Sequence, residues 1–298
     1  MSKGLLVVAR NNRSLDYIKQ ASFLADRAKQ ILNLPTSIIT DSVDYIEKQG
    51  WTDKFDNIIP LVYSNDEYVA GSNVLSKYED HNTRRYFDGA MYNTIMPFKN
   101  GARSSSYDIS PYDETILIDT DILLLDDNLK HCFESSSDFM IYRDHYDLAG
   151  FRPKTEFSYI SDAGVKFYWA TVVFFRKTPE NKIFFDLVQH IQDNWYHYRT
   201  IFQIPHQIFR NDHAFSIAIH IMNGYQDGDF ATPMPGKLYF TTDKDILWKF
   251  DGNKIVFLLE KENHIGEYTL ASWKDITVHV MNKFSLERMI DEYYESES

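Results

Sequence analysis

The 298-residue sequence lacks several features that mark common protein classes. It has a single cysteine, Cys132, which excludes an internal disulfide framework and a zinc site built from cysteines. It has no apolar run of about 18 residues, so we expect no transmembrane segment. The apolar stretch at residues 4–9 is too short for a signal peptide. We therefore expect a cytoplasmic protein.

Positive charge is also scarce in this chain. The 31 Lys and Arg residues stand against 43 Asp and Glu, giving a net charge of −12. Such a surface does not by itself attract nucleic acid or anionic lipid, although it leaves room for a local basic groove. We find no internal repeat and no low-complexity linker. We expect one continuous domain over residues 1–285, followed by an acidic tail over residues 286–298.

Aromatic residues, in contrast, are abundant. They make up 15% of the chain, with 20 Tyr and 21 Phe, within a total apolar share of 44%. This composition is ample for a sizeable core. A surplus of aromatic rings is also typical of clefts that bind flat or ring-shaped ligands.

The first 62 residues read as a strand–helix–strand unit. Residues 5–9 are a buried strand, and residues 18–32 repeat apolar side chains every three or four positions, as a helix does. Ser14 is the expected helix cap and Pro35 the expected stop. With further strands at 37–40 and 57–62, this pattern predicts a right-handed βαβ unit and a mainly parallel sheet.

The rest of the chain is expected to alternate between strands and helices. The expected helices are patches within 84–96, a helix beginning at Thr178-Pro179, a helix over 212–222 and a final helix in the acidic tail. Residues 144–166 are expected to be an irregular flap and 224–236 a loop. The expected strands are 115–118, 138–142, 167–176, 237–241, 254–258 and 276–280.

Residues 115–125 contain the most informative motif, Asp119-Thr120-Asp121 at the end of an apolar strand. Side chains alternate along a strand, so the two carboxylates point the same way and repel unless a cation lies between them. Mg²⁺ and Mn²⁺ prefer oxygen ligands and often bridge to phosphate. Open α/β sheets bind ligands beyond the carboxyl ends of their strands, so the motif predicts a divalent-metal site. The alternative is a strand that ends in a solvated turn.

Three later segments extend this pattern into a family resemblance. Residues 169–175 form a β-prone run before a helix, the segment Asn211-Asp212-His213-Ala214-Phe215 opens another helix, and His279 ends a late strand with Lys283 close behind. In this order the chain resembles the GT-A-fold glycosyltransferases, and most of all the glycogenin-like, galactosyltransferase-type retaining family (family 8). The resemblance implies one α/β domain with a mixed, mostly parallel central sheet flanked by helices and a Rossmann-like nucleotide-binding N-terminal half.

The same resemblance implies a metal-dependent transfer of sugar from a nucleotide-sugar donor, usually a UDP-sugar, to a hydroxyl acceptor with retention. Asp119 would contact the ribose and a Mn²⁺ (or Mg²⁺) ion, Asp121 would chelate the ion, and His279 would supply a nitrogen ligand. Lys283 would neutralise phosphate charge. The chain departs from the family's H-x-x-G-x-x-K-P-W pattern, because residues 279–283 lack its Gly and Trp and Lys283 comes two positions early.

Asp212-His213 stands where the family often has Asp-Gln. Asp212 would hydrogen-bond donor-sugar hydroxyls, or would be a carboxylate stabilised at a helix N-terminus. His213 would face the sugar, or would pack. Tyr168 and Trp169 are expected near the acceptor or in the core.

Donor contacts are also expected at the ends of the first strands and before the metal motif. One of Arg84, Arg85 and Arg103 is expected to neutralise the donor phosphates, because the guanidinium fork matches phosphate oxygens, or each lies on a solvated helix face. Arg103 is the favoured residue. Asp41, which ends the second strand, is expected to hydrogen-bond the base. The remaining expected donor-binding residues are Val8, Ala9, Arg10, Asn11 and Thr120.

Three alternatives stay open. A haloacid-dehalogenase-type phosphohydrolase also uses D-x-D after an apolar strand, but its motif lies near the N-terminus. A nucleotidyltransferase that makes activated sugars would need a glycine in the basic loop after the first strand, and residues 8–13 have none. A binding module without catalysis is the third. The acceptor, whether a glycan, a protein hydroxyl or a modified nucleobase, and a homodimeric state are not readable from the sequence.

Overall fold

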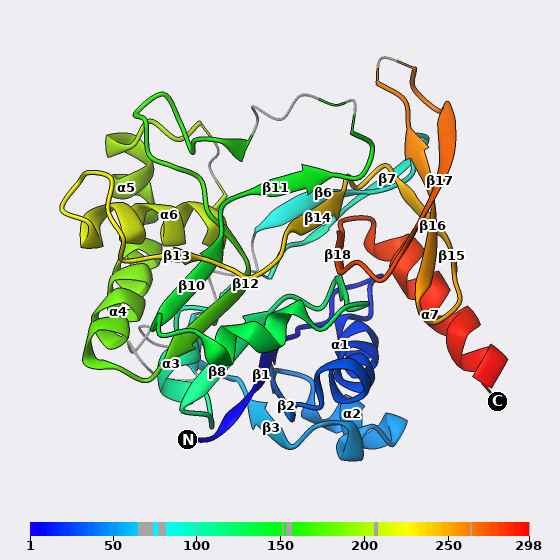
Figure 1. Ribbon diagram of the computed structural model, residues 1–298, viewed down its shortest axis with the longest axis horizontal. Helices are drawn as coiled ribbons and strands as arrows, with labels where there is room; N and C mark the ends of the chain where they lie inside the picture. The colour runs from blue at the N-terminus through cyan, green and yellow to red at the C-terminus, as the bar shows by residue number, and fades with distance from the viewer. Residues whose placement is uncertain are drawn as a thin grey trace.

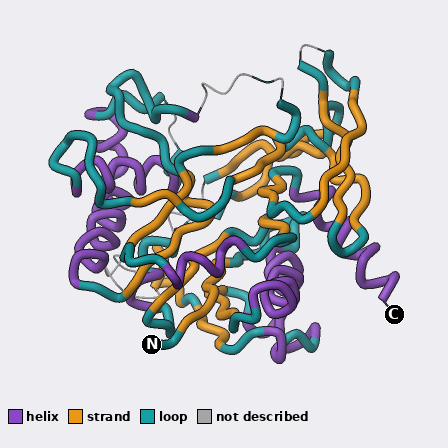
Figure 2. The backbone as a smooth tube through the Cα atoms, in the orientation of Figure 1, coloured by secondary structure: helices purple, strands orange, loops and turns teal. Residues whose placement is uncertain are grey.

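A seven-stranded sheet runs through the middle of the molecule, with helices on either side (Figures 1 and 2). The computed structural model describes residues 1–298 except 65–73, 77–81, 100, 151, 153–156, 206–207, 263 and 298. Six strands run in one direction, and β12 is antiparallel to both of its neighbours. In spatial order the strands are β13 (Thr232–Pro233), β10 (Phe139–Tyr142), β12 (Trp169–Arg176), β8 (Glu114–Ile118), β1 (Lys3–Val8), β2 (Thr36–Thr40) and β3 (Asn57–Pro60).

The helices group at the two ends of this sheet. In Figure 1, α1 and α2 lie beside β1–β3, whereas α4, α5 and α6 lie beside β10 and β12. The α-helices are α1 (Tyr17–Arg27), α2 (Val43–Gln49), α3 (Ser106–Ile109), α4 (Pro179–Asp193), α5 (Trp195–Ile201), α6 (Asn211–Met222) and α7 (Lys283–Glu297). A π-helical turn (Ala28–Leu32) extends α1, and 3-10 turns lie at Thr52–Lys54 and Asn128–Glu134. The expected mixed, mostly parallel sheet flanked by helices is confirmed.

Smaller sheets are built onto this framework. One has the order β11 (His145–Asp147), β14 (Leu238–Thr241), β18 (Val278–Val280) and β9 (Ile122–Leu123). A second is the antiparallel meander β15 (Ile246–Phe250), β16 (Lys254–Glu260) and β17 (Tyr268–Lys274). Two pairs complete the set: β4 (Val62–Ser64) with β5 (Val74–Ser76), and β6 (Thr83–Asp88) with β7 (Tyr92–Pro97).

The chain reverses its direction of travel across the central sheet between β1 and β8. It first moves outward from β1 to β2 and β3, and then returns to place β8 on the other side of β1. Both strands pair in parallel, from Lys3 opposite Glu114 to Val7 opposite Ile118. Connections on the two sides diverge at such a switch point, which leaves a crevice beyond the carboxyl ends of the strands. The Asp119-Thr120-Asp121 motif follows β8 directly and lies at this crevice.

The short strand β9 joins two hydrophobic cores. The larger core lies around the central sheet, and the smaller one lies between the meander, β18 and α7. Ile122 and Leu124 belong to the larger core, whereas Leu123 and Leu125 belong to the smaller one. This alternation follows from the strand geometry, which sends successive side chains to opposite faces.

Several helix predictions are confirmed in detail, and one cap is wrong. Helix α4 begins at Pro179, and the Thr178 side chain accepts a bond from the Asn181 backbone N–H, as an N-cap does. The cap of α1 is Asp16, not Ser14, and its carboxylate accepts from the Lys19 N–H at 3.0 Å. Asp16 is two residues closer to the first helical turn, where its oxygen reaches that donor.

The expected helical patches within 84–96 are wrong, because this segment is the β6–β7 hairpin. Gly89 at φ +70° lies in the connecting turn, and Asp-Gly between alternating side chains is a strong hairpin signal. The strand expected over 57–62 ends at Pro60.

Some strands were not predicted from the sequence. Strands β15 and β17 had no prediction, and β11 lies inside the segment expected to be irregular, of which residues 151 and 153–156 are outside the described ones. Beyond residue 285, the chain continues as α7. Its Leu286, Met289 and Ile290 side chains are buried in the smaller core.

Candidate metal and donor site

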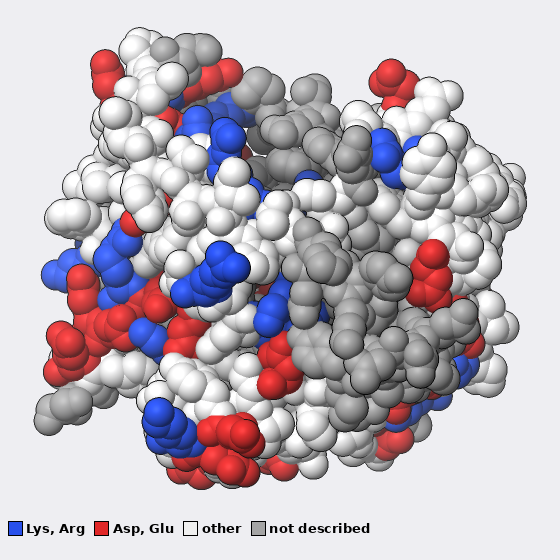
Figure 3. Space-filling view, turned by 180° about the vertical axis from the view of Figure 1, so that it is seen from behind, with Lys and Arg blue, Asp and Glu red and all other residues white. Residues whose placement is uncertain are grey.

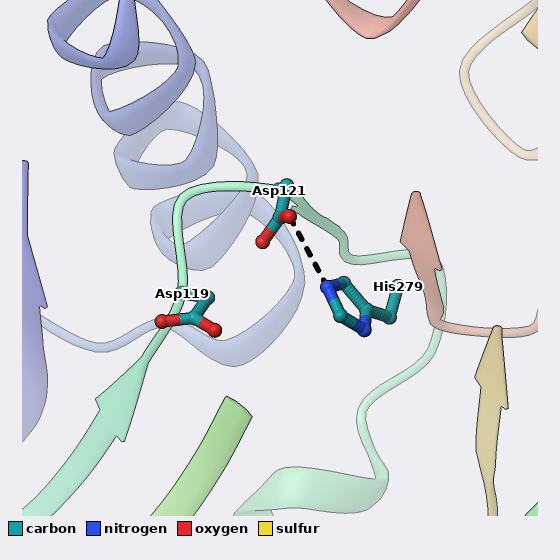
Figure 4. A group of neighbouring side chains, drawn as sticks. All are labelled: Asp119, Asp121 and His279. Carbon is teal, nitrogen blue, oxygen red and sulfur yellow. Dashed lines mark hydrogen bonds and ion pairs between the residues drawn. The ribbon is translucent and has the colours of Figure 1, made fainter. Parts of the chain in front are cut away.

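Three of the predicted ligands lie together at the crevice. One donor atom from each of Asp119, Asp121 and His279 fits within a group whose members are all within 4.8 Å of one another. Figure 4 shows the two carboxylates on the turn after β8 and the imidazole on β18 facing a common space. Backbone bonds fix both sides, because the Asp119 N–H donates to the Thr171 carbonyl on β12 (2.9 Å) and the Val280 N–H on β18 donates to the Asp121 carbonyl (2.9 Å).

Asp119 is held by Arg103. The guanidinium donates to Asp119 Oδ1 and to the carbonyl oxygens of Ala170 and Thr171. Ala102 before it adopts φ +72° in a buried turn, a left-handed conformation that costs an alanine about 1 kcal/mol or more. The Asp119 side chain keeps 38% of its surface exposed along the cleft. Desolvation by the surrounding protein still raises its pKa to about 6, with Arg103 opposing the rise and Asp121 adding to it.

Asp121 is buried and lies between two nitrogen groups. Lys283 Nζ lies 2.6 Å from Asp121 Oδ2, and His279 Nε2 lies 3.1 Å from the same oxygen. Burial raises the pKa of Asp121, but the Lys283 and His279 charges outweigh it and hold that pKa well below its ordinary value. His279 Nδ1 is buried and has no hydrogen-bond partner among the described residues, and the ring packs edge-on against Trp169. A ligand set of two carboxylates and one imidazole fits Mn²⁺ slightly better than Mg²⁺.

An open cleft surrounds this group. Including its open mouth, the cleft encloses about 990 Å³. Six basic side chains and three carboxylates line it, so the lining carries a net charge of +3 on a chain of −12. The basic ones are Arg10, Arg84, Lys99, Arg103, Arg210 and Lys283, and the acidic ones are Asp119, Asp121 and Asp212.

The cleft's charge differs from the charge of the surface as a whole. On the face seen in Figure 3, Asp and Glu side chains are interspersed with Lys and Arg. A cleft of one sign with low-dielectric walls focuses the field on a ligand of the opposite sign. The cleft of this protein is therefore suited to an anionic ligand.

The residues expected at the base and ribose divide into two sets. Val8, Arg10 and Thr120 line the cleft. Ala9, Asn11 and Asp41 are not among the lining residues, and each instead contacts neighbouring parts of the fold. Ala9 is buried and its N–H donates to Ile39. Asn11 bonds to the start of α1 at Asp16 and Ile18. Asp41 pairs with Arg10 at 3.2 Å and with Lys99 at 3.4 Å, so it holds two cleft cations in position.

Asp212 and His213 point to different surroundings. Asp212 lines the cleft, and its carboxylate accepts from the Ala170 N–H (3.0 Å) and from Arg210 (2.9 Å). His213 is buried outside the lining residues, with its ring stacked on Trp195 at 6.0 Å and edge-on to Phe167. The structure thus brings Asp212 to the site and places His213 in side-chain packing.

Several lining residues lie outside the favoured set, although Arg84 is one of the three arginines considered above. Arg84 and Tyr86 come from β6, Lys99 from the segment after β7, and Arg210 from the residue before α6. Arg84 lies over the rings of Tyr86 and Phe98, at 5.7 and 5.6 Å. The alternation of Arg84 and Tyr86 is a strand signal, which the prediction of helical patches in this segment missed. Trp169, expected at the acceptor or in the core, lines the cleft while being 1% exposed.

Comparisons with known proteins give structural neighbours only. No protein-family model and no curated protein matches the chain. Within the described residues, none of the helices has the length and apolar character needed to span a bilayer.

Solved structures similar to this one include glycosyltransferases. Glycosyltransferase GlyE of Streptococcus pneumoniae TIGR4 aligns at 12% identity and TM-score 0.42 over 78% of this chain and 45% of GlyE, so the chain spans less than half of GlyE's length. Galactosyltransferase LgtC, in complex with donor and acceptor sugar analogues, aligns at 11% identity and TM-score 0.45 over 72% of this chain and 70% of LgtC. Mouse xyloside xylosyltransferase 1 aligns at 9% identity and TM-score 0.39 over 78% and 85%. Because these TM-scores are below 0.5, a function for this chain has to be argued from the geometry of its own site.

Proposed function

We propose that this protein is a metal-dependent glycosyltransferase. It moves a sugar from a nucleotide-sugar donor, with UDP-sugars as the first candidates, to a hydroxyl acceptor, and it retains the anomeric configuration. The observation that carries the proposal is the group of Asp119, Asp121 and His279 at the floor of a cleft whose lining has a net charge of +3.

The charge balance of the cleft supports a diphosphate ligand. A nucleoside diphosphate sugar brings two negative charges, and its leaving group gains charge as the sugar bond breaks. Lysine and arginine donors in a partly water-excluded cleft stabilise that charge more strongly than water does. Arg103 and Lys283, each beside one of the two carboxylates, are the side chains available for this role.

Asp119, Asp121 and His279 would hold a divalent cation, with Mn²⁺ preferred over Mg²⁺. The ion would act as a Lewis acid on the diphosphate oxygens. Arg103 orients Asp119 through the β12 carbonyls, and Lys283 and His279 orient Asp121. These contacts pre-set the two carboxylates, so little side-chain freedom is lost when a ligand binds.

The remaining lining residues divide between the two ends of the donor. Val8, Arg10 and Thr120, which line the cleft, would contact the nucleoside. Asp212, fixed by Arg210 and the Ala170 N–H, is placed to accept hydrogen bonds from sugar hydroxyls. The single cysteine is consistent with a cytoplasmic location, which we include in the proposal.

Ligand-induced stabilisation tests the donor and metal assignments together. Thermal melting of the full chain is measured with Mn²⁺ alone, with UDP-, GDP- and CMP-sugars alone, and with each combination. A ligand that binds the native state raises the melting midpoint, so we expect the largest rise for one nucleotide sugar with Mn²⁺. No rise with any combination contradicts the proposal.

Product analysis then separates the alternatives. Release of nucleoside diphosphate from the donor indicates glycosyl transfer or its hydrolytic side reaction. Release of pyrophosphate from a nucleoside triphosphate and a sugar 1-phosphate indicates a nucleotidyltransferase. Release of phosphate from a monoester, without a nucleotide requirement, indicates a phosphohydrolase.

A further inference from the structure

A second hollow lies beside the donor cleft and shares no lining residue with it. Including its open mouth it encloses about 850 Å³, against about 990 Å³ for the cleft. We call it the β11 pocket, because its lining comes from β11, the two residues before β11 and residues 157–159. The lining residues are Arg143, Asp144, His145, Tyr146, Phe157, Ser158 and Tyr159. We propose that the β11 pocket binds one sugar unit of an oligosaccharide acceptor.

The β11 pocket is next to the sugar end of the proposed donor site. Trp169 lines the cleft, and its ring centroid lies 5.5 Å from that of His145 in the β11 pocket and 5.9 Å from that of His279. The following residue, Ala170, donates its N–H to Asp212, which the proposed function assigns to the donor sugar. An acceptor hydroxyl has to reach that sugar, so the inference rests on the proposed function. Because the two hollows have separate linings, the β11 pocket would hold a sugar unit other than the one that reacts.

The charge of the β11 pocket is nearly balanced, unlike that of the cleft. Among its described lining residues, Arg143 and Asp144 carry opposite formal charges and the others carry none when histidine is counted as neutral. Lys237 lies outside the lining, over the ring of Tyr146 at 4.7 Å. The pocket is therefore within one charge of neutral, whereas the cleft lining carries +3. This balance suits a ligand that offers hydroxyl groups better than one that offers a diphosphate.

Two buried ring nitrogens between the hollows have no hydrogen-bond partner among the described residues. His145 Nδ1 lies 3.2 Å from the Arg143 carbonyl oxygen, which can only accept, so Nδ1 carries the proton and Nε2 remains an acceptor without a donor. Trp169 Nε1 is a donor without an acceptor. Unsatisfied buried polar atoms are destabilising, and each calls for an explanation. A hydroxyl both donates and accepts, so a ligand rich in hydroxyls can satisfy either nitrogen.

Aromatic rings supply the apolar part of the β11 pocket. Phe157 packs on Trp169 with ring centroids 4.8 Å apart and on His145 at 5.6 Å, so the inner wall is firmly packed. Tyr159 is 53% exposed, and its backbone is held by an isolated β-bridge to Lys166. Aromatic faces with a few polar groups around them are typical of small-molecule sites, and sugar rings pack their apolar faces on such rings. We therefore assign Tyr159 as the ring on which the sugar unit packs.

Saccharide binding by the full chain, without donor or metal, tests the proposal. The probes are an array of defined glycans from monosaccharides to tetrasaccharides and an array of synthetic peptides. We expect oligosaccharides to be retained and Y159A to lower their affinity about tenfold, whereas Y159F keeps the ring and should bind like the wild type. Y196A is the matched control, because Tyr196 on α5 is 78% exposed and does not line the β11 pocket. No retained saccharide, retention of peptides alone, or equal effects of Y159A and Y196A overturns the proposal.

Hydrogen exchange gives a second readout that does not depend on any variant. A retained trisaccharide should slow the exchange of the amides of residues 143–147 and 157–159 in the wild-type chain. Slowing that is confined to other parts of the chain contradicts binding in the β11 pocket.

Product analysis tests the acceptor role and separates the two proposals. With Mn²⁺ and the nucleotide sugar that gives the largest rise in melting midpoint, a retained oligosaccharide should gain one sugar unit by mass spectrometry. A retained oligosaccharide that is never extended contradicts the acceptor role. A rise in melting midpoint without saccharide binding overturns the β11 pocket alone, whereas saccharide binding without any such rise overturns the transferase assignment and the acceptor role with it.

Discussion

Strand β8 carries a carboxylate at each of its two ends, and the protein holds the two in opposite ways. At the amino end, Glu114 pairs with Arg176 at 2.8 Å and with Lys3 at 3.3 Å. At the carboxyl end, directly after the strand, Asp119 pairs with Arg103 but also lies close to a second carboxylate, that of Asp121. One strand thus presents a matched ion pair and a crowded acidic pair a few residues apart.

The pKa values of the two carboxyls express this difference. Burial raises the pKa of Glu114, but Arg176 and Lys3 outweigh burial and lower the pKa below its ordinary value. At Asp119, burial wins and the pKa rises to about 6. A carboxylate whose charge is fully compensated serves the fold. A carboxylate whose charge is only partly compensated can accept a further cation, and such incomplete compensation is common at functional sites.

Substitution of Asp121 by Asn should have the largest effect on both the stability of the protein and its turnover. The change removes the buried anion that Lys283 Nζ contacts at 2.6 Å, and breaking a buried ion pair costs about 3 kcal/mol of unfolding free energy. A metal that supplies several kcal/mol of charge stabilisation would also be lost, so turnover should fall by roughly 10³. Denaturant unfolding and donor turnover measure the two effects. Asp127→Asn, on the exposed turn nearby (64% exposed), is the matched control, and normal turnover in Asp121→Asn would remove Asp121 from the site.

His279→Gln should weaken the site without emptying it. The amide keeps a polar group near Asp121 but lacks the imidazole nitrogen, so we expect Mn²⁺ affinity to fall by about 10–100-fold. Calorimetric titration of Mn²⁺ in the absence of donor gives the affinity directly. His131→Gln changes an exposed histidine (57% exposed) and should leave the affinity as it is. Equal affinities in all three proteins would exclude His279 as a ligand.

Glu114→Gln should affect stability and its pH dependence but not the site. Loss of a buried, charge-assisted pair costs about 2 kcal/mol. Because the folded-state pKa lies below that of the unfolded chain, the stabilisation is fully present above pH of about 5 and is lost as pH falls through about 4 toward the folded value. Unfolding of both proteins from neutral pH to pH of about 3 should show the difference between them narrowing on acidification. A difference that widens there contradicts the assignment.

Arg84→Ala should produce the smallest change. Arg84 lines the cleft and, among the described cleft cations, is the one with no carboxylate within ion-pair distance. A single charge-assisted contact to a ligand phosphate is worth about 1.5 kcal/mol, so the donor Kd should rise roughly tenfold. The next residue on β6, Arg85, points to the other face, and Arg85→Ala should change the donor Kd less than twofold. Equal effects of the two substitutions would assign Arg84 to general surface charge.

Local patterns in the sequence were sufficient for the parts of the fold built from continuous apolar runs. Strands β2 and β8 are fully buried, and β1 and β12 are buried except at their ends. Helix α4 has both an apolar stripe and the Thr178-Pro179 start. The meeting of Asp119, Asp121 and His279 was expected from the family resemblance, since nothing local to residue 279 indicates what lies 158 positions earlier.

The misplaced elements share a physical cause. Strands β6, β7 and β17 are half-exposed and carry apolar side chains on both faces, so neither helix nor strand periodicity is clean. The cleft residues that these elements and the α6 start contribute, such as Arg84 and Arg210, depend on how separate elements pack together. Their position is set by tertiary contacts that a local pattern does not contain.

The alternation of β9 between the two cores has a further consequence for how the site can change. Asp119 is tied to the sheet by β12, Asp121 is tied to the smaller sheet by β18, and the next four residues are divided between the two interiors. Any repacking that thickens or thins one interior shifts one carboxylate relative to the other. Substitutions at Leu286 or Met289, which lie in the smaller core and do not line the cleft, should therefore change the spacing of the proposed metal ligands and the ion that they favour.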